Sequence, residues 1–313
     1  MDYVILGRTG LRVSVMGLGC GGPSRLGQTA GHSEAESIAV VQRALDLGVT
    51  LVDTAYAYGT ETIVGKALSG ARRGDVVLST KRGAAQDGRL LSAPEMVAAV
   101  ESSLQKLQTD YIDIFHLHGL KLEQYEHAAN EIVPALLQLK AQGKIRFLGV
   151  TENFETDTNH VMTQRALDDD WWDVMMLGFN IINQSARQRV FPRTVAKGIG
   201  VLGMFAVRRA LSRPDRLRAV MENLVERGQV DAAAFTEADP LDFVLADSDA
   251  VDLTDAAYRY CRHEPGMHVV LSGTGNVAHL AENAESLLRP ALPSVVQQRL
   301  ATLFARVNSV SGS

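Results

Sequence analysis

Four residues whose side chains could support acid–base chemistry follow short apolar runs in the first part of the chain. Asp53 follows one such run and Tyr58 comes five positions later, while Lys81 and His118 follow two further runs. A tyrosine with a pKa of about 10 exchanges protons poorly at neutral pH unless its phenolate is stabilised. A nearby ammonium provides that stabilisation, and a carboxylate keeps the ammonium charged. Together with a histidine that orients a carbonyl oxygen, these residues could polarise a C=O bond and protonate its oxygen.

Each of these residues also has a structural interpretation. Asp53 could cap a turn, Lys81 could be a solvated surface charge, and Tyr58 could be a packed aromatic residue. His116 and His118 point the same way along one strand, so we expect one of them to be structural. The set contains no nucleophile and no His/Asp/Glu spacing that suggests a metal site. Hydride from a nicotinamide cofactor is therefore the most natural attacking species.

Short apolar strands alternate with helical sequence along the chain. Helices are expected to begin at the capping boxes of residues 33–36 and 92–95, and two further helices are expected at residues 131–141 and 184–196. The strands are expected near residues 16, 51, 77, 113, 148, 175, 201 and 270. This alternation predicts a parallel sheet covered by helices, and eight such units favour a closed (β/α)8 TIM barrel over an open doubly wound sheet. Active sites of such barrels lie at the C-terminal ends of the strands, where Asp53, Lys81 and His118 are expected.

Segments outside the repeat complete the predicted architecture. Residues 3–14 have the pattern of a small hairpin, and residues 277–288 and 294–307 are expected to be additional C-terminal helices. Residues 208–250, between the seventh and eighth strands, form an insertion that is either a lid or a surface decoration. We expect residues 1–313 to form a single barrel domain.

Composition narrows the cellular context. The formal net charge of −5 gives no general attraction to nucleic acid or to a membrane surface. Cys20 and Cys261 are the only cysteines, too few for a disulfide framework or a thiolate-rich metal site, and Cys20 is interpreted as a small filler. Since no signal peptide or apolar run of about 18 residues is evident, a cytoplasmic protein without nucleic-acid or membrane partners is expected. The oligomeric state is not predicted.

Several of these segments, in the same order and spacing, resemble the aldo-keto reductase superfamily. They are Leu6-Gly-Arg-Thr-Gly-Leu-Arg-Val-Ser14, Gly17-Leu-Gly19, Asp53-Thr-Ala-Tyr-Ala-Tyr58-Gly, Gly65-Lys-Ala-Leu, Ser79-Thr-Lys81, Tyr111-Ile-Asp-Ile-Phe-His-Leu-His118 and Gly143-Lys-Ile-Arg-Phe-Leu-Gly-Val-Thr151. The resemblance implies a barrel plugged by an N-terminal hairpin and NAD(P)H-dependent reduction of aldehydes or ketones, or the reverse oxidation. It also implies that Asp53, Tyr58, Lys81 and His118 are catalytic, with Tyr58 as the acid/base.

The same resemblance implies a set of cofactor-binding residues. Thr151 replaces a serine that contacts the carboxamide, either Glu152 or Asn153 provides the neighbouring contact, and Met176 stands where a glutamine is usual. Met204 or Phe205 would pack on the nicotinamide ring. The full set is Gly19, Asp53, Thr151, Asn153, Met204, Phe205, Ser272, Gly273, Thr274, Gly275, His279 and Asn283.

The glycine-rich stretch from residue 271 resembles the cofactor-phosphate segment of this superfamily. A loop of this kind entering a helix presents backbone N–H groups to phosphate. The basic residues that usually meet the 2′-phosphate of NADPH are replaced by Gly273 and His279. NADP(H) and NAD(H) therefore both remain candidates.

The main functional prediction is an oxidoreductase acting on an aldehyde, a ketone or a sugar carbonyl or alcohol. Met176 and Met204 motivate an alternative, a cofactor-binding sensor or regulatory subunit with little turnover. A third possibility is an isomerase or aldolase that uses Lys81 as a Schiff-base amine. Trp171 and Trp172 precede the sixth strand, at the opposite end from the site, and are interpreted as packing residues.

Overall fold

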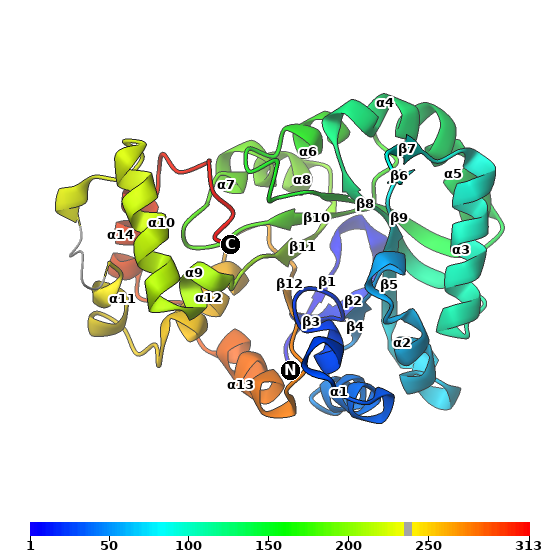
Figure 1. Cartoon of the computed structure of the whole chain (residues 1–313), viewed down its shortest axis with the longest axis horizontal. Coiled ribbons are helices and arrows are strands. Elements are labelled where there is room, and N and C mark those ends of the chain that lie inside the picture. Colours follow the sequence, from blue (N-terminus) through cyan, green and yellow to red (C-terminus); the bar gives the residue numbers. More distant parts are fainter. Residues whose placement is uncertain (235–239) are drawn as a thin grey trace.

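Eight parallel strands close into a barrel in the computed structural model, which describes residues 1–234 and 240–313 (Figure 1). Around the barrel the strand order is β10-β11-β12-β3-β4-β5-β8-β9. The strands are β3 (Met16–Gly19), β4 (Leu51–Asp53), β5 (Val77–Arg82), β8 (Ile112–Leu120), β9 (Ile145–Glu152), β10 (Val174–Gly178), β11 (Gly200–Met204) and β12 (Val269–Ser272). Each lies where the sequence predicted a strand, so the closed barrel is confirmed and the open sheet is excluded.

Helices follow the strands and form the outer layer of the barrel (Figure 1). They are α1 (Glu34–Asp46), α2 (Glu61–Ala67), α3 (Ala93–Leu107), α5 (Val133–Ala141), α6 (Val161–Ala166), α7 (Ala186–Arg189), α8 (Phe191–Ala196) and α12 (Leu253–Arg262), followed by α13 (Val277–Leu288) and α14 (Ser294–Leu303). Capping boxes begin two of them, with Ser33 and Glu36 at α1 and Ser92 and Glu95 at α3. These boxes satisfy backbone N–H groups that have no partner inside the helix.

Several boundaries differ from the prediction. Residues 131–141 are the end of a longer helical stretch that begins with α4 (Tyr125–His127) and a π-helical turn at Ala128–Ile132. The expected helix 184–196 is divided into α7 and α8 at Val190, and α14 ends at Leu303 instead of residue 307. A small hairpin, β6 (Ala85–Gln86) and β7 (Arg89–Leu90), was not predicted, although its Asp-Gly turn is a typical hairpin signal.

The N-terminal hairpin closes the barrel at the end opposite to the strand C-termini. Strands β1 (Tyr3–Ile5) and β2 (Arg12–Ser14) are antiparallel and flank the 3-10 turn η1 (Gly7–Thr9). Leu6 is fully buried and packs with residues of the barrel interior, among them Leu51 and Val174. Arg8 donates from Nη2 to the backbone oxygen of Trp172 at 2.8 Å. The predicted plug is therefore present.

The Trp172 side chain itself is completely buried, and its Nε1 donates to Tyr125 Oη at 2.9 Å. Its role here is packing, as predicted.

The segment 208–250 is largely helical where the structure describes it. It contains α9 (Arg209–Ser212), α10 (Pro214–Glu226), the 3-10 turn η7 (Ala232–Ala234) and α11 (Asp242–Ala246), and residues 235–239 of the predicted insertion lie outside the described part. Figure 1 shows α10, α11 and α14 gathered at one side of the barrel. Within residues 1–234 and 240–313, no helix is both long and apolar enough to span a membrane.

Candidate active site

Asp53 and Lys81 form a buried ion pair at the C-terminal ends of β4 and β5. Lys81 Nζ lies 2.5 Å from Asp53 Oδ2 and 2.7 Å from the backbone oxygen of Thr54. Ser79 donates to the other carboxylate oxygen of Asp53 at 2.7 Å. The exposed fractions of Asp53 and Lys81 are only 3% and 1%. The parallel pairing of β4 and β5 puts these side chains next to each other, as the sequence predicted.

Tyr58 and His118 complete the cluster from two other elements. Tyr58 lies in the 3-10 turn η3 (Tyr56–Tyr58), directly after β4, and His118 lies near the end of β8. The Tyr58 hydroxyl is 3.3 Å from His118 Nε2, and the two rings meet edge to face at 87°. Lys81 Nζ is 5.0 Å from the centroid of the Tyr58 ring. All four predicted residues are thus brought together.

Burial dominates the acid–base properties of this cluster. It raises the pKa of Tyr58 above its ordinary value, although Lys81 acts in the opposite direction. We expected the ammonium to lower this pKa, and the structure shows that burial outweighs it. Burial also opposes the charge of Lys81, but Asp53 and Tyr58 together leave the pKa of Lys81 above its ordinary value. Burial, with Lys81 and Arg82, lowers the pKa of His118 to about 3. At neutral pH the cluster therefore holds a protonated phenol, an ammonium and a neutral imidazole.

Two neighbours of the cluster have structural roles. His116 is completely buried under the cluster and fills the space beside Gly149, where an added Cβ would lie 2.1 Å from His116 Nδ1. Of the two histidines on this strand, one of which was expected to be structural, His116 therefore has the position of a packing residue. Cys20 is also fully buried, and burial raises the pKa of its thiol, which disfavours the reactive thiolate.

A cavity of about 200 Å³ opens beside Tyr58. The predicted residues Gly19, Asp53, Met204, Phe205 and Gly273 line it. It is also lined by residues that the sequence analysis did not assign to the site, namely Gly21, Gly22, Pro23, Ala206, Val207, Arg208, Tyr258 and Leu271, and by Met176. The cavity runs from the tyrosine to the loop after β12.

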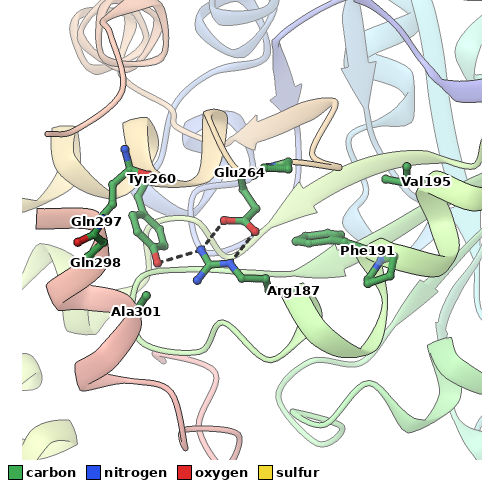
Figure 2. Close-up of a pocket in the computed structure, with 10 residues that line it drawn as sticks. Arg187, Phe191, Val195, Tyr260, Glu264, Gln297, Gln298 and Ala301 are labelled. Atoms are coloured by element: carbon green, nitrogen blue, oxygen red, sulfur yellow. Dashed lines mark hydrogen bonds and ion pairs between the residues drawn. The ribbon is translucent and has the colours of Figure 1, made fainter. Parts of the chain in front are cut away.

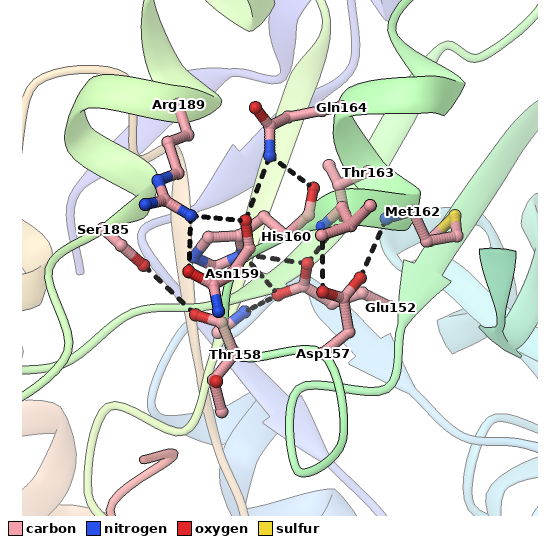
Figure 3. Close-up of polar contacts among 12 residues, drawn as sticks. Glu152, Asp157, Thr158, Asn159, His160, Met162, Thr163, Gln164, Ser185 and Arg189 are labelled. Atoms are coloured by element: carbon pink, nitrogen blue, oxygen red, sulfur yellow. Dashed lines mark hydrogen bonds and ion pairs between the residues drawn. The ribbon is translucent and has the colours of Figure 1, made fainter. Parts of the chain in front are cut away.

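The structure separates the two candidates for the carboxamide contact after β9. The Glu152 carboxylate is fully buried and accepts hydrogen bonds from His160 Nδ1 at 2.9 Å, Thr163 Oγ1 at 2.7 Å and the backbone N–H of Gly178 at 2.8 Å (Figure 3). These contacts tie β9 to α6 and β10 and occupy both of its oxygens. Asn153, which is half-buried, is therefore the better candidate.

Thr151 is buried at the end of β9. Its Oγ1 accepts a hydrogen bond from the backbone N–H of Gly119 at 2.7 Å. Its hydroxyl therefore links the ends of β8 and β9, and its O–H remains available as a donor.

The loop after β12 is packed closely against the loop after β3. Ser272 Oγ lies 2.9 Å from Tyr258 Oη and accepts from Asn283 Nδ2 at 3.0 Å. A Cβ at Gly273 would lie 2.9 Å from the backbone oxygen of Gly19, so a lysine would not fit there without a backbone shift.

The rest of this loop also contains no lysine or arginine. A Cβ at Gly275 would lie 2.4 Å from the backbone of Gly27, Thr274 Oγ1 accepts from the backbone N–H of Asn276, and His279 is exposed on α13. The predicted phosphate segment therefore offers phosphate mainly backbone and hydroxyl groups.

A second, larger hollow of about 510 Å³ lies between α7, α8, α12 and α14 (Figure 2). Its cation, Arg187, donates from Nε to Glu264 at 2.7 Å and from Nη2 to Tyr260 at 3.0 Å. It contains none of the predicted site residues, so the cavity beside Tyr58 is the candidate active site.

Comparison with known proteins agrees with this geometry. The chain is 32% identical over 203 residues to L-galactose dehydrogenase of Arabidopsis thaliana, a match that covers 63% of this chain and only 62% of that protein. It is 25% identical over 291 residues to the uncharacterized oxidoreductase YqkF of Bacillus subtilis (strain 168), covering 90% and 89% of the two chains. The holo form of the aldo-keto reductase AKR11C1 from Bacillus halodurans superimposes with a TM-score of 0.76 at 25% identity, covering 99% and 98%.

The family described as Aldo/keto reductase family matches residues 16–302, which include the whole barrel and all four clustered residues. This chain is therefore an oxidoreductase that belongs to the aldo/keto reductase family.

Proposed function

We propose that the protein transfers hydride between NAD(P)H and the carbonyl carbon of an aldehyde, ketone or sugar, with Tyr58 as the general acid. The observation that carries this proposal is the Tyr58 hydroxyl, 3.3 Å from His118 Nε2 and beside the buried Lys81–Asp53 pair. A bound nicotinamide would supply the hydride. The protein supplies the proton and the orientation of the substrate.

Each member of the cluster has a distinct role in this proposal. The neutral His118 imidazole orients the carbonyl oxygen beside the Tyr58 hydroxyl. The Tyr58 O–H bond breaks as its proton passes to that oxygen, and the resulting phenolate is stabilised by Lys81. Asp53 holds the ammonium in place. In the oxidative direction, the phenolate takes the proton back from the alcohol.

Part of the predicted dinucleotide site lines the cavity. Gly19 and Gly273 leave backbone exposed in its wall, and Met204 and Phe205 provide apolar surface for the ring. Thr151 and Asn153 would hold the carboxamide. Ser272, Thr274, Gly275 and Asn283, with His279 at the edge, would surround the adenosine phosphates. Because Gly273 and His279 add no fixed positive charge, we propose that NAD(H) is accepted as well as NADP(H).

The alternatives are less well supported. Lys81 is almost completely buried and engaged by Asp53 and the Thr54 carbonyl, so it is an ammonium and not a free amine for a Schiff base. A sensor with little turnover is favoured only by Met176 and Met204, two apolar residues in the cavity wall. Sugars are included in the proposed substrate class because the Arabidopsis relative is named as an L-galactose dehydrogenase.

The test compares the variants Tyr58→Phe and Tyr56→Phe. Tyr56 is the matched control, since its ring lies between Arg82 and Lys106 and does not line the cavity. We expect Tyr58→Phe to lower kcat for a panel of aldehydes, ketones and sugars by about 10²–10⁴-fold, the usual contribution of a general acid. The Kd for NADH should stay within about twofold of the wild-type value, because a hydroxyl outside the phosphate loop contributes little to dinucleotide binding.

Retained turnover in Tyr58→Phe would contradict the assignment of the proton donor. A wild-type protein that binds NADH or NADPH but reduces no compound of the panel, and oxidises none of the corresponding alcohols, would favour the sensor.

A further inference from the structure

Phe205 lines the cavity in a backbone conformation that its neighbours must maintain. Its φ is +68°, in the left-handed region that side chains rarely adopt. Such a conformation persists only where the surrounding contacts fix it. Asn180 Nδ2 donates to the backbone oxygen of Phe205 at 3.2 Å, and Arg208 Cζ lies 4.0 Å from the centroid of the ring. The loops after β10 and β11 thus fix its backbone and one face of its ring.

Phe154, in the loop after β9, makes an aromatic contact with the same ring. The two ring centroids are 5.5 Å apart and the rings meet edge to face at 84°, an arrangement that aromatic pairs favour. Phe154 is almost completely buried, and a Cβ at Gly178 would lie 2.1 Å from its Cδ1. Its ring therefore fits only because position 178 is a glycine, and it has little freedom to move away from Phe205.

His160 supports Phe154 with the face of its imidazole ring. The two rings are stacked, with centroids 5.2 Å apart and planes inclined by 19°. His160 is fully buried, and its Nε2 has no hydrogen-bond partner among the described residues. A buried polar atom without a partner is destabilising, so hydrogen bonding alone does not explain a histidine at this position. The flat ring that packs on Phe154 does.

The Glu152 carboxylate fixes the orientation of that imidazole. It lies 2.9 Å from His160 Nδ1, and its other hydrogen bonds join β9 to α6 and β10 (Figure 3). A continuous series of contacts therefore leads from this carboxylate through His160 and Phe154 to Phe205 in the cavity wall.

We propose that Phe154 is a positioning residue for the nicotinamide ring that acts through Phe205, and that His160 and Glu152 hold Phe154 in place. The inference rests on the proposed function, in which Phe205 provides apolar surface for that ring. A displaced Phe205 would leave the nicotinamide without this surface. The contacts of the adenosine phosphates, at the loop after β12, would not change. The loss of affinity should therefore be confined to the nicotinamide half of the dinucleotide.

The test compares ligands with and without the nicotinamide ring by calorimetric titration, in the absence of substrate. The ligands are NADH and NADPH, and ADP-ribose and its 2′-phosphate, which lack that ring. We expect Phe154→Leu to weaken binding of both dinucleotides by about three- to tenfold, the effect of losing one aromatic pair, and to leave the Kd of the two shorter ligands unchanged. His160→Gln keeps an N–H donor for Glu152 but removes the ring face, so it should cause the same selective loss.

Phe304→Leu is the matched control, because Phe304 is as deeply buried as Phe154 but lies at the end of α14. It should leave the ratio of the Kd of NADH to that of ADP-ribose unchanged. A double-mutant cycle tests the route of the effect. If Phe154 acts through Phe205, Phe154→Leu should cause no further loss in the Phe205→Leu background.

Equal losses of affinity for NADH and ADP-ribose in Phe154→Leu would show a merely structural role and overturn the inference. A Kd ratio equal to that of Phe304→Leu would also overturn it, and a full effect in the Phe205→Leu background would exclude the route through Phe205. In each case a proposed function supported by Tyr58→Phe would stand. If the wild-type protein bound neither NADH nor NADPH, the proposed function would fail as well. Melting temperatures show whether each variant is folded, and His160→Gln tests the same inference if Phe154→Leu is not.

Discussion

At the scale of single residues, the position of the Tyr58 ring depends on the glycine at position 21, which packs against it. A Cβ at Gly21 would lie 2.3 Å from Cε2 of the Tyr58 ring. We therefore expect Gly21→Ala to displace the ring from His118 and to lower kcat by about 10- to 100-fold, since a shift of about 1 Å in a reacting group has effects of this size. Steady-state kinetics test this.

The control for this prediction is Gly74→Ala, because an added Cβ at Gly74 has no atom within 4 Å. A kcat of Gly21→Ala equal to that of Gly74→Ala would show that the tyrosine tolerates the methyl group. Circular dichroism of both variants separates a local displacement from misfolding.

The close approach of Asp53, Lys81 and His118 could be predicted, because each lies at or near the end of a strand and the strand ends of a barrel converge. Arg208 and Tyr258 were not predicted as site residues. Arg208 lies in the loop between β11 and α9, where no periodic pattern reveals the direction of a side chain. Tyr258 lies on α12, and a buried position on a helix does not by itself indicate a cavity.

At the scale of elements, the Glu152 carboxylate joins β9, β10 and α6 through His160, Thr163 and the Gly178 backbone. Removing the shared acceptor leaves buried donors without partners, which typically costs about 1–3 kcal/mol, and more for charged groups. We expect Glu152→Ala to lower the free energy of unfolding by at least about this amount. Urea denaturation followed by circular dichroism measures the change.

The matched variant is Glu123→Ala, in which the carboxylate is 71% exposed and lies 3.9 Å from Lys121. Its effect should stay within about 0.5 kcal/mol, as is usual for an exposed position. Comparable losses in the two variants would mean that the Glu152 network contributes little to stability.

The elements themselves differ in how well they could be predicted. Helices that begin with a capping box, such as α1 and α3, were placed closely because side chains at fixed spacing define their first turn. The helical stretch that ends in α5 was expected to begin at residue 131, but it begins at Tyr125. A π-helical turn joins its parts, and such a turn shifts the helical phase without a sequence signal of its own.

At the scale of the whole molecule, the barrel was predictable because eight repeated strand–helix units have few ways to bury all their apolar faces. The two ends of this barrel differ in the residues that occupy them. The C-terminal end of the strands carries the polar cluster around Tyr58, and the hairpin seals the other end with Leu6, Leu11 and Val13. The apolar seal and the proposed chemistry are therefore separated in space, so we expect a change at the sealed end to affect stability and not activity.

Adjacent residues in this hairpin allow that separation to be tested. Leu6 is fully buried against the barrel interior, while Ile5 is 54% exposed. Leu6→Ala should lower the free energy of unfolding by about 2–5 kcal/mol through lost burial and a residual cavity, whereas Ile5→Ala should change it by no more than about 0.5 kcal/mol. In both variants kcat at 25 °C should stay close to the wild-type value, because Tyr58 lies at the other end of the barrel. Chemical denaturation and steady-state kinetics on the same preparations measure both quantities, and a fall in kcat that parallels the loss of stability would contradict the separation.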